Sequence, residues 1–217
     1  MDWELARYLL VEQQIRPWDV LDKRVLQRFL DVKREDFVPA DKKNLAFVDT
    51  ELPLGNGAYM LAPKVEGRLL QEVALKPTDR VLVVGAGTGY LMALAAGLCA
   101  EVQGVEIEPA LKAQAEQNLV RAGIKNARVE LADGSQGYTA KAPYDVIIVT
   151  GSFGAVPQAL KDQLAIGGRL IAVVGELPIM SAVLETRVEE GAWRSEKRFE
   201  YNLPRLAQEK SAPAFSF

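Results

Sequence analysis

Three glycines at alternate positions, Gly85, Gly87 and Gly89, follow an apolar run at residues 81–84. Glycine has no Cβ, so such a backbone can turn tightly and come close to a ligand. The run Val-Leu-Val-Val predicts a strand buried on both faces, and the apolar segment at residues 90–100 predicts a helix. Strand, glycine turn and helix form a candidate nucleotide site, because amides at a helix start bind anionic groups. A glycine cluster alone is weak evidence, and a purely structural turn is the alternative.

The spacing of the glycines favours one class of nucleotide. A dinucleotide fold requires Gly-x-Gly-x-x-Gly, and Tyr90 occupies the place of its third glycine, where a large side chain would crowd the helix against the strand. The spacing Gly-x-Gly-x-Gly is instead typical of Rossmann-like methyltransferases, whose ligand is S-adenosylmethionine. We therefore predict that the turn holds this cofactor.

Two acidic residues end the next two predicted strands. Glu106 lies at a distance past the glycines that suits a carboxylate accepting hydrogen bonds from both ribose hydroxyls. Asp133 could accept a hydrogen bond from the adenine amino group, and Gly134 leaves room for the ring. Both acids could instead be solvated side chains at strand ends. Because the carboxyl ends of parallel strands meet at one edge of a sheet, suitable groups on three successive strands favour a cofactor site.

The elements that position these residues alternate along the chain. Strands are predicted at residues 80–85, 101–107, 127–133, 144–151 and 167–175, separated by helical or loop segments. This alternation predicts right-handed crossovers and a mostly parallel sheet. Two alternating stretches around Glu190 and Gly191 predict a closing hairpin. We expect an α/β fold of the Rossmann-like class I methyltransferase type, with a mostly parallel seven-stranded sheet and helices on both faces.

The first sixty or so residues have a different pattern. Amphipathic helical segments at residues 3–15 and 21–32 lead into an irregular segment at residues 35–63. We predict an N-terminal helical cap carrying the acceptor-site segment over residues 1–63. The S-adenosylmethionine-binding domain, with its C-terminal hairpin, is then expected over residues 64–217.

The composition excludes several classes of function. The chain has no histidine and one cysteine, Cys99, which excludes Ser-His-Asp and Cys-His catalysis, histidine-metal sites and an intrachain disulfide. We expect no metal, and Cys99 as a small core residue. A net charge of -3 argues against nucleic acid as the main partner. The N-terminus lacks the pattern of an export signal and the longest apolar stretch is too short to span a bilayer, so we expect no membrane partner and a cytoplasmic location.

Nearly the whole chain resembles the protein-L-isoaspartate O-methyltransferase family. The resemblance rests on the order and spacing of RVLQRFLDVKREDFVP, AFVDTELPLGNG, VLVVGAGTGY, GVEIEPAL, ADGSQG, APYDVIIVTG, VPQALKDQLAIGGRL and RFEYNLPRL. It implies methylation of the abnormal carboxylate of isoaspartyl residues in damaged proteins, with S-adenosylmethionine as cofactor and S-adenosylhomocysteine as product. Implied cofactor contacts lie at Gly85, Ala86, Gly87, Gly89, Glu106, Ile107, Asp133 and Gly134.

The sequence departs from the family near the expected methyl-transfer site. Where the family usually has a segment close to GQTISQP, this chain has GAYMLAP at residues 57–63, so Leu61 stands at the position of the active-site serine and Tyr59 at that of the threonine. Val83 stands where the family normally carries an acid that helps to position the methionine end of the ligand. Tyr59, Met60 and Leu61 are therefore the candidate catalytic residues of a divergent branch.

These departures leave three hypotheses about function. The first is methylation of isoaspartyl residues in a protein or peptide. The second keeps the cofactor but changes the acceptor to a small molecule or another protein group, and the third is a catalytically silent, cofactor-binding scaffold or regulator. A carboxylate attacks the methyl group itself, so the protein supplies mainly orientation and desolvation, and backbone amides of residues 57–61 could replace a serine hydroxyl. Alternatively, AYML is simply core packing beneath the cap. The sequence predicts no oligomeric state.

Overall fold

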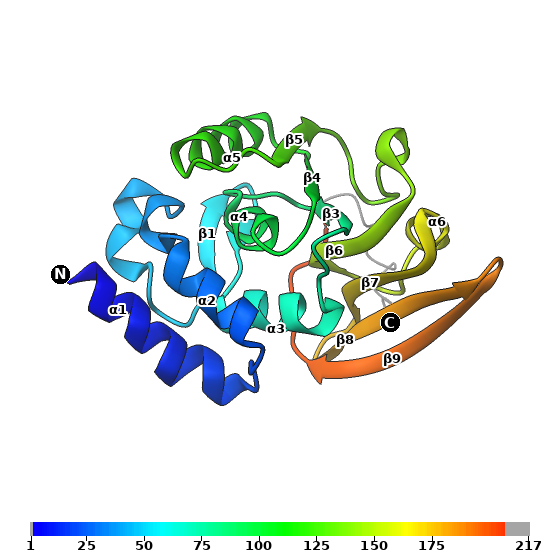
Figure 1. Cartoon of the computed structure of the whole chain (residues 1–217), viewed down its shortest axis with the longest axis horizontal. Coiled ribbons are helices and arrows are strands. Elements are labelled where there is room, and N and C mark those ends of the chain that lie inside the picture. The colour runs from blue at the N-terminus through cyan, green and yellow to red at the C-terminus, as the bar shows by residue number, and fades with distance from the viewer. Residues whose placement is uncertain (1, 207–217) are drawn as a thin grey trace, which may run out of the picture.

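The computed structural model describes residues 2–206 and confirms the predicted Rossmann-like architecture. In Figure 1 the N-terminal helices lie at one end of the molecule, and the C-terminal hairpin extends toward the opposite end. The helices at the N-terminal end are α1 (Trp3–Leu10) and α2 (Lys23–Asp31), and the strands of the hairpin are β8 (Ile179–Glu189) and β9 (Ala192–Glu200).

Within the described residues, seven strands form one sheet in the order β5-β4-β3-β6-β7-β8-β9. Its parallel part consists of β3 (Arg80–Val84), β4 (Glu101–Glu106), β5 (Ala127–Leu131), β6 (Tyr144–Phe153) and β7 (Leu164–Glu176). Strands β8 and β9 pair antiparallel as the predicted hairpin. The strand order reverses between β3 and β6, and a crevice for a ligand forms at such a point in an open α/β sheet.

Alternate residues of the central strands pack on opposite faces of the sheet, which explains why their sequences are continuously apolar. Val81 and Val83 of β3 join the larger core cluster, while Leu82 and Val84 join a second cluster on the other face. The larger cluster includes the cap and residues of α3 (Pro63–Val73), α4 (Tyr90–Ala96) and α5 (Pro109–Arg121). The second cluster includes a residue of the short helix α6 (Gln158–Asp162). Helices therefore cover both faces, as predicted.

The N-terminal region differs from its sequence-based description in one important respect. The segment expected to be irregular contains a hairpin of β1 (Leu52–Gly55) and β2 (Ala58–Met60), besides short 3-10 helices. The two strands are joined by Asn56 and Gly57, whose φ values are +48° and +77°. Asn-Gly favours hairpins because both residues adopt left-handed backbone conformations at low cost. The sequence therefore carried a signal for this hairpin that the prediction missed.

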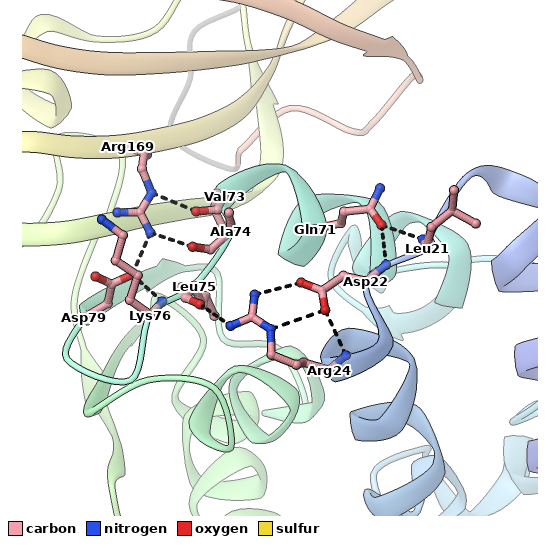
Figure 2. A network of polar contacts seen from close by, with 10 residues as sticks. All are labelled: Leu21, Asp22, Arg24, Gln71, Val73, Ala74, Leu75, Lys76, Asp79 and Arg169. Atoms are coloured by element: carbon pink, nitrogen blue, oxygen red, sulfur yellow. Dashed lines mark hydrogen bonds and ion pairs between the residues drawn. The ribbon is translucent and has the colours of Figure 1, made fainter.

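The C-terminal end of α3 connects the cap with the sheet, as Figure 2 shows. From the sheet, Arg169 of β7 donates a hydrogen bond at 2.7 Å to the carbonyl oxygen of Val73, where the helix ends. From the cap, the backbone amides of Leu21 and Asp22 donate to the side-chain oxygen of Gln71 at 2.6 and 2.9 Å. The C-terminal end of α3 is thus hydrogen-bonded both to the sheet and to the cap, which holds the cap on the sheet. The domain boundary between residues 63 and 64 stays a prediction.

Cys99 is buried in the core, as predicted. Its Sγ donates to the carbonyl oxygen of Ala95 at 3.2 Å, and burial raises the pKa of the thiol to about 12. A thiol with such a pKa stays protonated at neutral pH and is a poor nucleophile.

Across residues 2–206, no helix combines the length and the apolar character that crossing a membrane requires.

Candidate active site

A cavity of about 270 Å³ lies at the carboxyl ends of the central strands. Its wall combines the ends of β3, β4 and β6 with the turn after β5, the β1–β2 hairpin and the segment after β9. The predicted site residues on this wall are Gly85, Gly87, Glu106, Ile107, Asp133, Gly134, Tyr59 and Leu61. Ala86, Gly89 and Met60 were also predicted, but among the described residues they do not belong to the lining.

The glycine turn has the backbone conformation that its sequence requires. Gly85, Gly87 and Gly89 all have positive φ values, of +84°, +54° and +84°. A Cβ on Gly85 would also lie 2.2 Å from Oγ1 of Thr150 in β6. The Thr150 hydroxyl lies 2.8 Å from the carbonyl oxygen of Gly85 and donates a hydrogen bond to the end of β3. The turn is therefore held against β6 and presents bare backbone to the cavity.

Glu106 is a buried carboxylate fixed by the backbone. Its Oε2 accepts a hydrogen bond from the Gly87 amide at 2.7 Å, and its Oε1 accepts from the amides of Ile107 and Glu108 at 3.0 and 3.1 Å. A carboxylate has about four acceptor positions, so these three donors leave about one, on Oε2. This geometry suits a hydrogen bond from one ribose hydroxyl, and it also couples the glycine turn to the end of β4.

The turn after β5 has the form expected for a surface under an adenine ring. The Oδ1 atom of Asp133 accepts a hydrogen bond from the Ser135 amide at 2.9 Å, which holds the carboxylate at the cavity wall. Gly134 is buried, and a Cβ there would lie 2.6 Å from Val105 and 2.7 Å from Val84. Only glycine therefore fits at this position without displacing the apolar side chains below it.

The segment at residues 59–61 divides between the cavity and the core. Tyr59 is 45% exposed, whereas Met60 and Leu61 are 4% and 5% exposed and belong to the core cluster. Leu61 lines the cavity as well, and its side chain brings no hydrogen-bond donor. Met60 is thus a core residue, while Tyr59 and Leu61 form part of the cavity wall.

A buried arginine of the cap fixes the backbone at Leu61. Arg34 is fully buried, donates a hydrogen bond at 2.7 Å to the Leu61 carbonyl oxygen, and forms an ion pair with Glu66 of α3. Its guanidinium also lies 4.8 Å from the ring centre of Tyr90. That ring packs edge-on against Phe37 of the cap, so Tyr90, the first residue of α4, packs against the cap. Arg34 therefore links the backbone at Leu61 to α3.

Stability should depend on pH through Glu66, whose pKa burial raises from 4.5 to about 7, against the opposing effect of Arg34. A folded-state pKa above the unfolded value means that the bound proton stabilises the fold fully below about pH 4.5, and this contribution is lost as the pH rises through about 7. Relative to Glu66→Gln, the wild-type free energy of unfolding should fall by about 2 kcal/mol between pH 5 and pH 8. Urea unfolding of both proteins measures this difference. If the wild-type free energy of unfolding instead rose with pH relative to that of Glu66→Gln, Arg34 would be keeping the Glu66 carboxylate ionised.

Several residues on the wall were missed by the sequence analysis. Thr150 lies near the carboxyl end of β6, and the rule that ligands bind at the carboxyl ends of strands could have found it. Glu51 lines the cavity and accepts a hydrogen bond from the hydroxyl of Tyr201. The segment at residues 203–206 also lines it and runs beside β6, where the Ser152 amide donates to the Pro204 carbonyl at 2.9 Å. No local pattern marked Glu51 or this segment as part of a site.

Comparisons with known proteins agree with this geometry. The family model for protein-L-isoaspartate(D-aspartate) O-methyltransferase matches residues 7–198. The chain belongs to this family. The protein-L-isoaspartate O-methyltransferase of Methanoculleus marisnigri is 42% identical over 166 residues, which cover 76% of each chain. That of Petrotoga mobilis is 35% identical over 197 residues, covering 90% of this chain and 92% of that one.

The fold agrees with the same family. A solved structure from Plasmodium falciparum, described as a protein-L-isoaspartate O-methyltransferase in complex with S-adenosyl-L-homocysteine, has a TM-score of 0.80 at 22% identity. The match covers 94% of this chain and 98% of that one. As a member of the protein-L-isoaspartate O-methyltransferase family, the chain is an S-adenosylmethionine-dependent O-methyltransferase.

The residues of the cavity fit S-adenosylmethionine. Gly85 and Gly87 bring bare backbone to the wall, Glu106 has an acceptor position left on Oε2, and Gly134 gives a surface without a side chain. When bound, this cofactor supplies an electrophilic methyl group on a positively charged sulfur. Val83, at the family's acidic position, is fully buried and pairs with Gly104 and Ile148 in the sheet. Among residues 2–206, no group of three or more His, Cys, Asp or Glu side chains could hold a metal ion.

Proposed function

We propose that this protein methylates the free carboxylate of isoaspartyl residues in proteins and peptides. The observation that carries the proposal is the continuity of the cavity, whose wall includes both the cofactor residues around Glu106 and the acceptor-site residues Tyr59 and Leu61. The family membership supports the same acceptor, because relatives that cover most of the chain are named for it.

The chemistry of the wall is compatible with a carboxylate acceptor. A carboxyl group is ionised at neutral pH, so its oxygen can attack the methyl group without a general base, and the absence of histidine from the chain is no obstacle. The tasks left to the protein are to orient the acceptor and to exclude water. In our proposal Leu61 excludes water, while the backbone of the β1–β2 hairpin and the hydroxyl of Tyr59 orient the acceptor. We assign the cofactor contacts to Gly85, Gly87, Glu106, Ile107, Asp133 and Gly134.

A pair of synthetic peptides tests the proposed acceptor. One contains an isoaspartyl residue, and the other contains a normal aspartyl residue at the same position. We expect the protein to transfer label from S-adenosyl-L-[methyl-³H]methionine to the first peptide only, in a base-labile form typical of a methyl ester. Transfer to both peptides would overturn the specificity, and cofactor binding without transfer to either would favour a different acceptor or a silent scaffold.

Replacing Leu61 by serine is expected to raise kcat/KM for the isoaspartyl peptide. The new hydroxyl can donate to one carboxylate oxygen of the acceptor, and a hydrogen bond to a charged group corresponds to about ten-fold or more in rate, or about 1.4 kcal/mol. Steady-state methylation kinetics measure the change, and Leu61→Ala, which makes the same space without a hydroxyl, is the matched control. An equal gain in both variants would mean that space, rather than the hydroxyl, limits the reaction.

A further inference from the structure

Acidic residues outnumber basic residues on the cavity wall. Four acids line it: Glu51, Glu106, Glu108 and Asp133. Among the described residues, Arg205 is the only lysine or arginine in the lining. A carboxylate that enters such a cavity is repelled by most of the charged side chains on its wall, and among the described lining side chains Arg205 is the one whose charge attracts it.

The fold places Arg205 away from the acids that serve the cofactor. Arg205 bridges to Ser152 at the end of β6, and its side chain reaches Gly175 near the end of β7. In the sheet order β5-β4-β3-β6-β7, these two strands lie on one side of β3, while Glu106 of β4 and Asp133 after β5 lie on the other. Arg205 and the two acids Glu106 and Asp133 therefore line the cavity from opposite sides of β3.

The guanidinium of Arg205 is only partly engaged in the protein. Its Nη2 donates at 2.6 Å to the carbonyl oxygen of Gly175 and at 2.6 Å to the Glu176 carboxylate. Its Nη1 is buried and has no hydrogen-bond partner among the described residues. The side chains of Arg205 and Glu176 are 22% and 74% exposed, so solvent at the Glu176 end weakens their ion pair. Another carboxylate can therefore compete with Glu176 for the guanidinium.

We propose that Arg205 binds the carboxylate of the methyl acceptor, and that Glu176 forms an ion pair with the guanidinium until the acceptor displaces it. This proposal rests on the proposed function, because it takes the acceptor to be an isoaspartyl carboxylate. Guanidinium groups bind carboxylates through paired, charge-assisted hydrogen bonds, which fix orientation as well as position. Arg205 thus supplies the polar contact that the apolar side chain of Leu61 does not.

The test measures binding of two fluorescent peptides by anisotropy, with saturating S-adenosylhomocysteine present. One peptide contains isoaspartate, and the other carries a carboxamide in place of its free carboxylate. We expect wild-type protein to bind the carboxylate peptide about ten-fold more tightly, and Arg205→Gln to remove this preference. Glu176→Gln should strengthen binding of the carboxylate peptide by up to about five-fold, because the competing carboxylate is gone.

A control variant and the opposite effects expected of Arg205→Gln and Glu176→Gln on peptide binding distinguish this role from a structural one. Arg194→Gln removes an exposed positive charge of β9 that does not line the cavity, and it should leave the preference unchanged. If Arg205 and Glu176 only held the fold together, both of their variants would weaken binding of both peptides. Retention of the full preference by Arg205→Gln would overturn the role of Arg205 alone. Equal binding of both peptides by wild-type protein would overturn the proposed acceptor together with that role.

Discussion

Replacing Arg34 by methionine is expected to lower the free energy of unfolding by about 3 to 5 kcal/mol. The side chain is fully buried, and its loss leaves both the Glu66 carboxylate and the Leu61 carbonyl oxygen without their partner. A buried polar group without a partner costs more than the pair contributed. Urea unfolding measures the change. Arg194→Met, at an exposed position, is the control and should change stability by less than about 0.5 kcal/mol.

A second substitution shows whether the ion pair causes the loss. Because two apolar side chains can replace a buried ion pair with little cost, the double variant Arg34→Met with Glu66→Met should recover part of the stability lost in Arg34→Met. Recovery stays incomplete, since the Leu61 carbonyl oxygen is still unpaired. If the two substitutions destabilise additively, the pair is not coupled and the proposed cause is wrong.

Replacing Glu106 by alanine is expected to weaken binding of S-adenosylhomocysteine by about 100-fold or more, which corresponds to about 3 kcal/mol. The variant loses the acceptor for a ribose hydroxyl, and a hydrogen bond to a charged group contributes about 1.5 to 3 kcal/mol. It also loses the contact at 2.7 Å with the Gly87 amide, so the glycine turn is no longer fixed to β4. Both effects lower the affinity.

Calorimetric titration of wild-type and variant protein measures this affinity. Glu108→Gln is the matched control, because Glu108 lines the same cavity but its carboxylate pairs with Asn56 at 3.2 Å. We expect less than a five-fold change in that control, because glutamine keeps an acceptor for the exposed contact with Asn56 and only the charge is lost. Unchanged affinity in Glu106→Ala would show that the ribose lies elsewhere.

The cofactor half of the site could be predicted from sequence because local signals encode it. A continuous apolar run identifies a strand buried on both faces, and glycines identify positions with positive φ, as Gly85, Gly87 and Gly89 show. Parallel strands then bring their carboxyl ends to one edge, so Glu106 and Asp133 could be assigned to one site. The hairpin at Asn56 and Gly57 was missed although its turn has an equally local signal.

The acceptor half depended on contacts between residues far apart in the chain. Glu51 and Tyr201, whose side chains are hydrogen-bonded beside the cavity, are separated by 150 positions, and Ser152 and Leu203, which join β6 to the C-terminal segment, by 51. Such contacts follow from how the cap and the C-terminal segment pack on the sheet, and packing leaves no periodic pattern in the sequence. The sequence by itself therefore determined the sheet, the glycine turn and the two acids to which we assign cofactor contacts. Only the tertiary structure decided that Leu61, rather than Met60, reaches the cavity and that Arg205 lies across from those acids, because burial and charge pairing at these positions are set by distant neighbours.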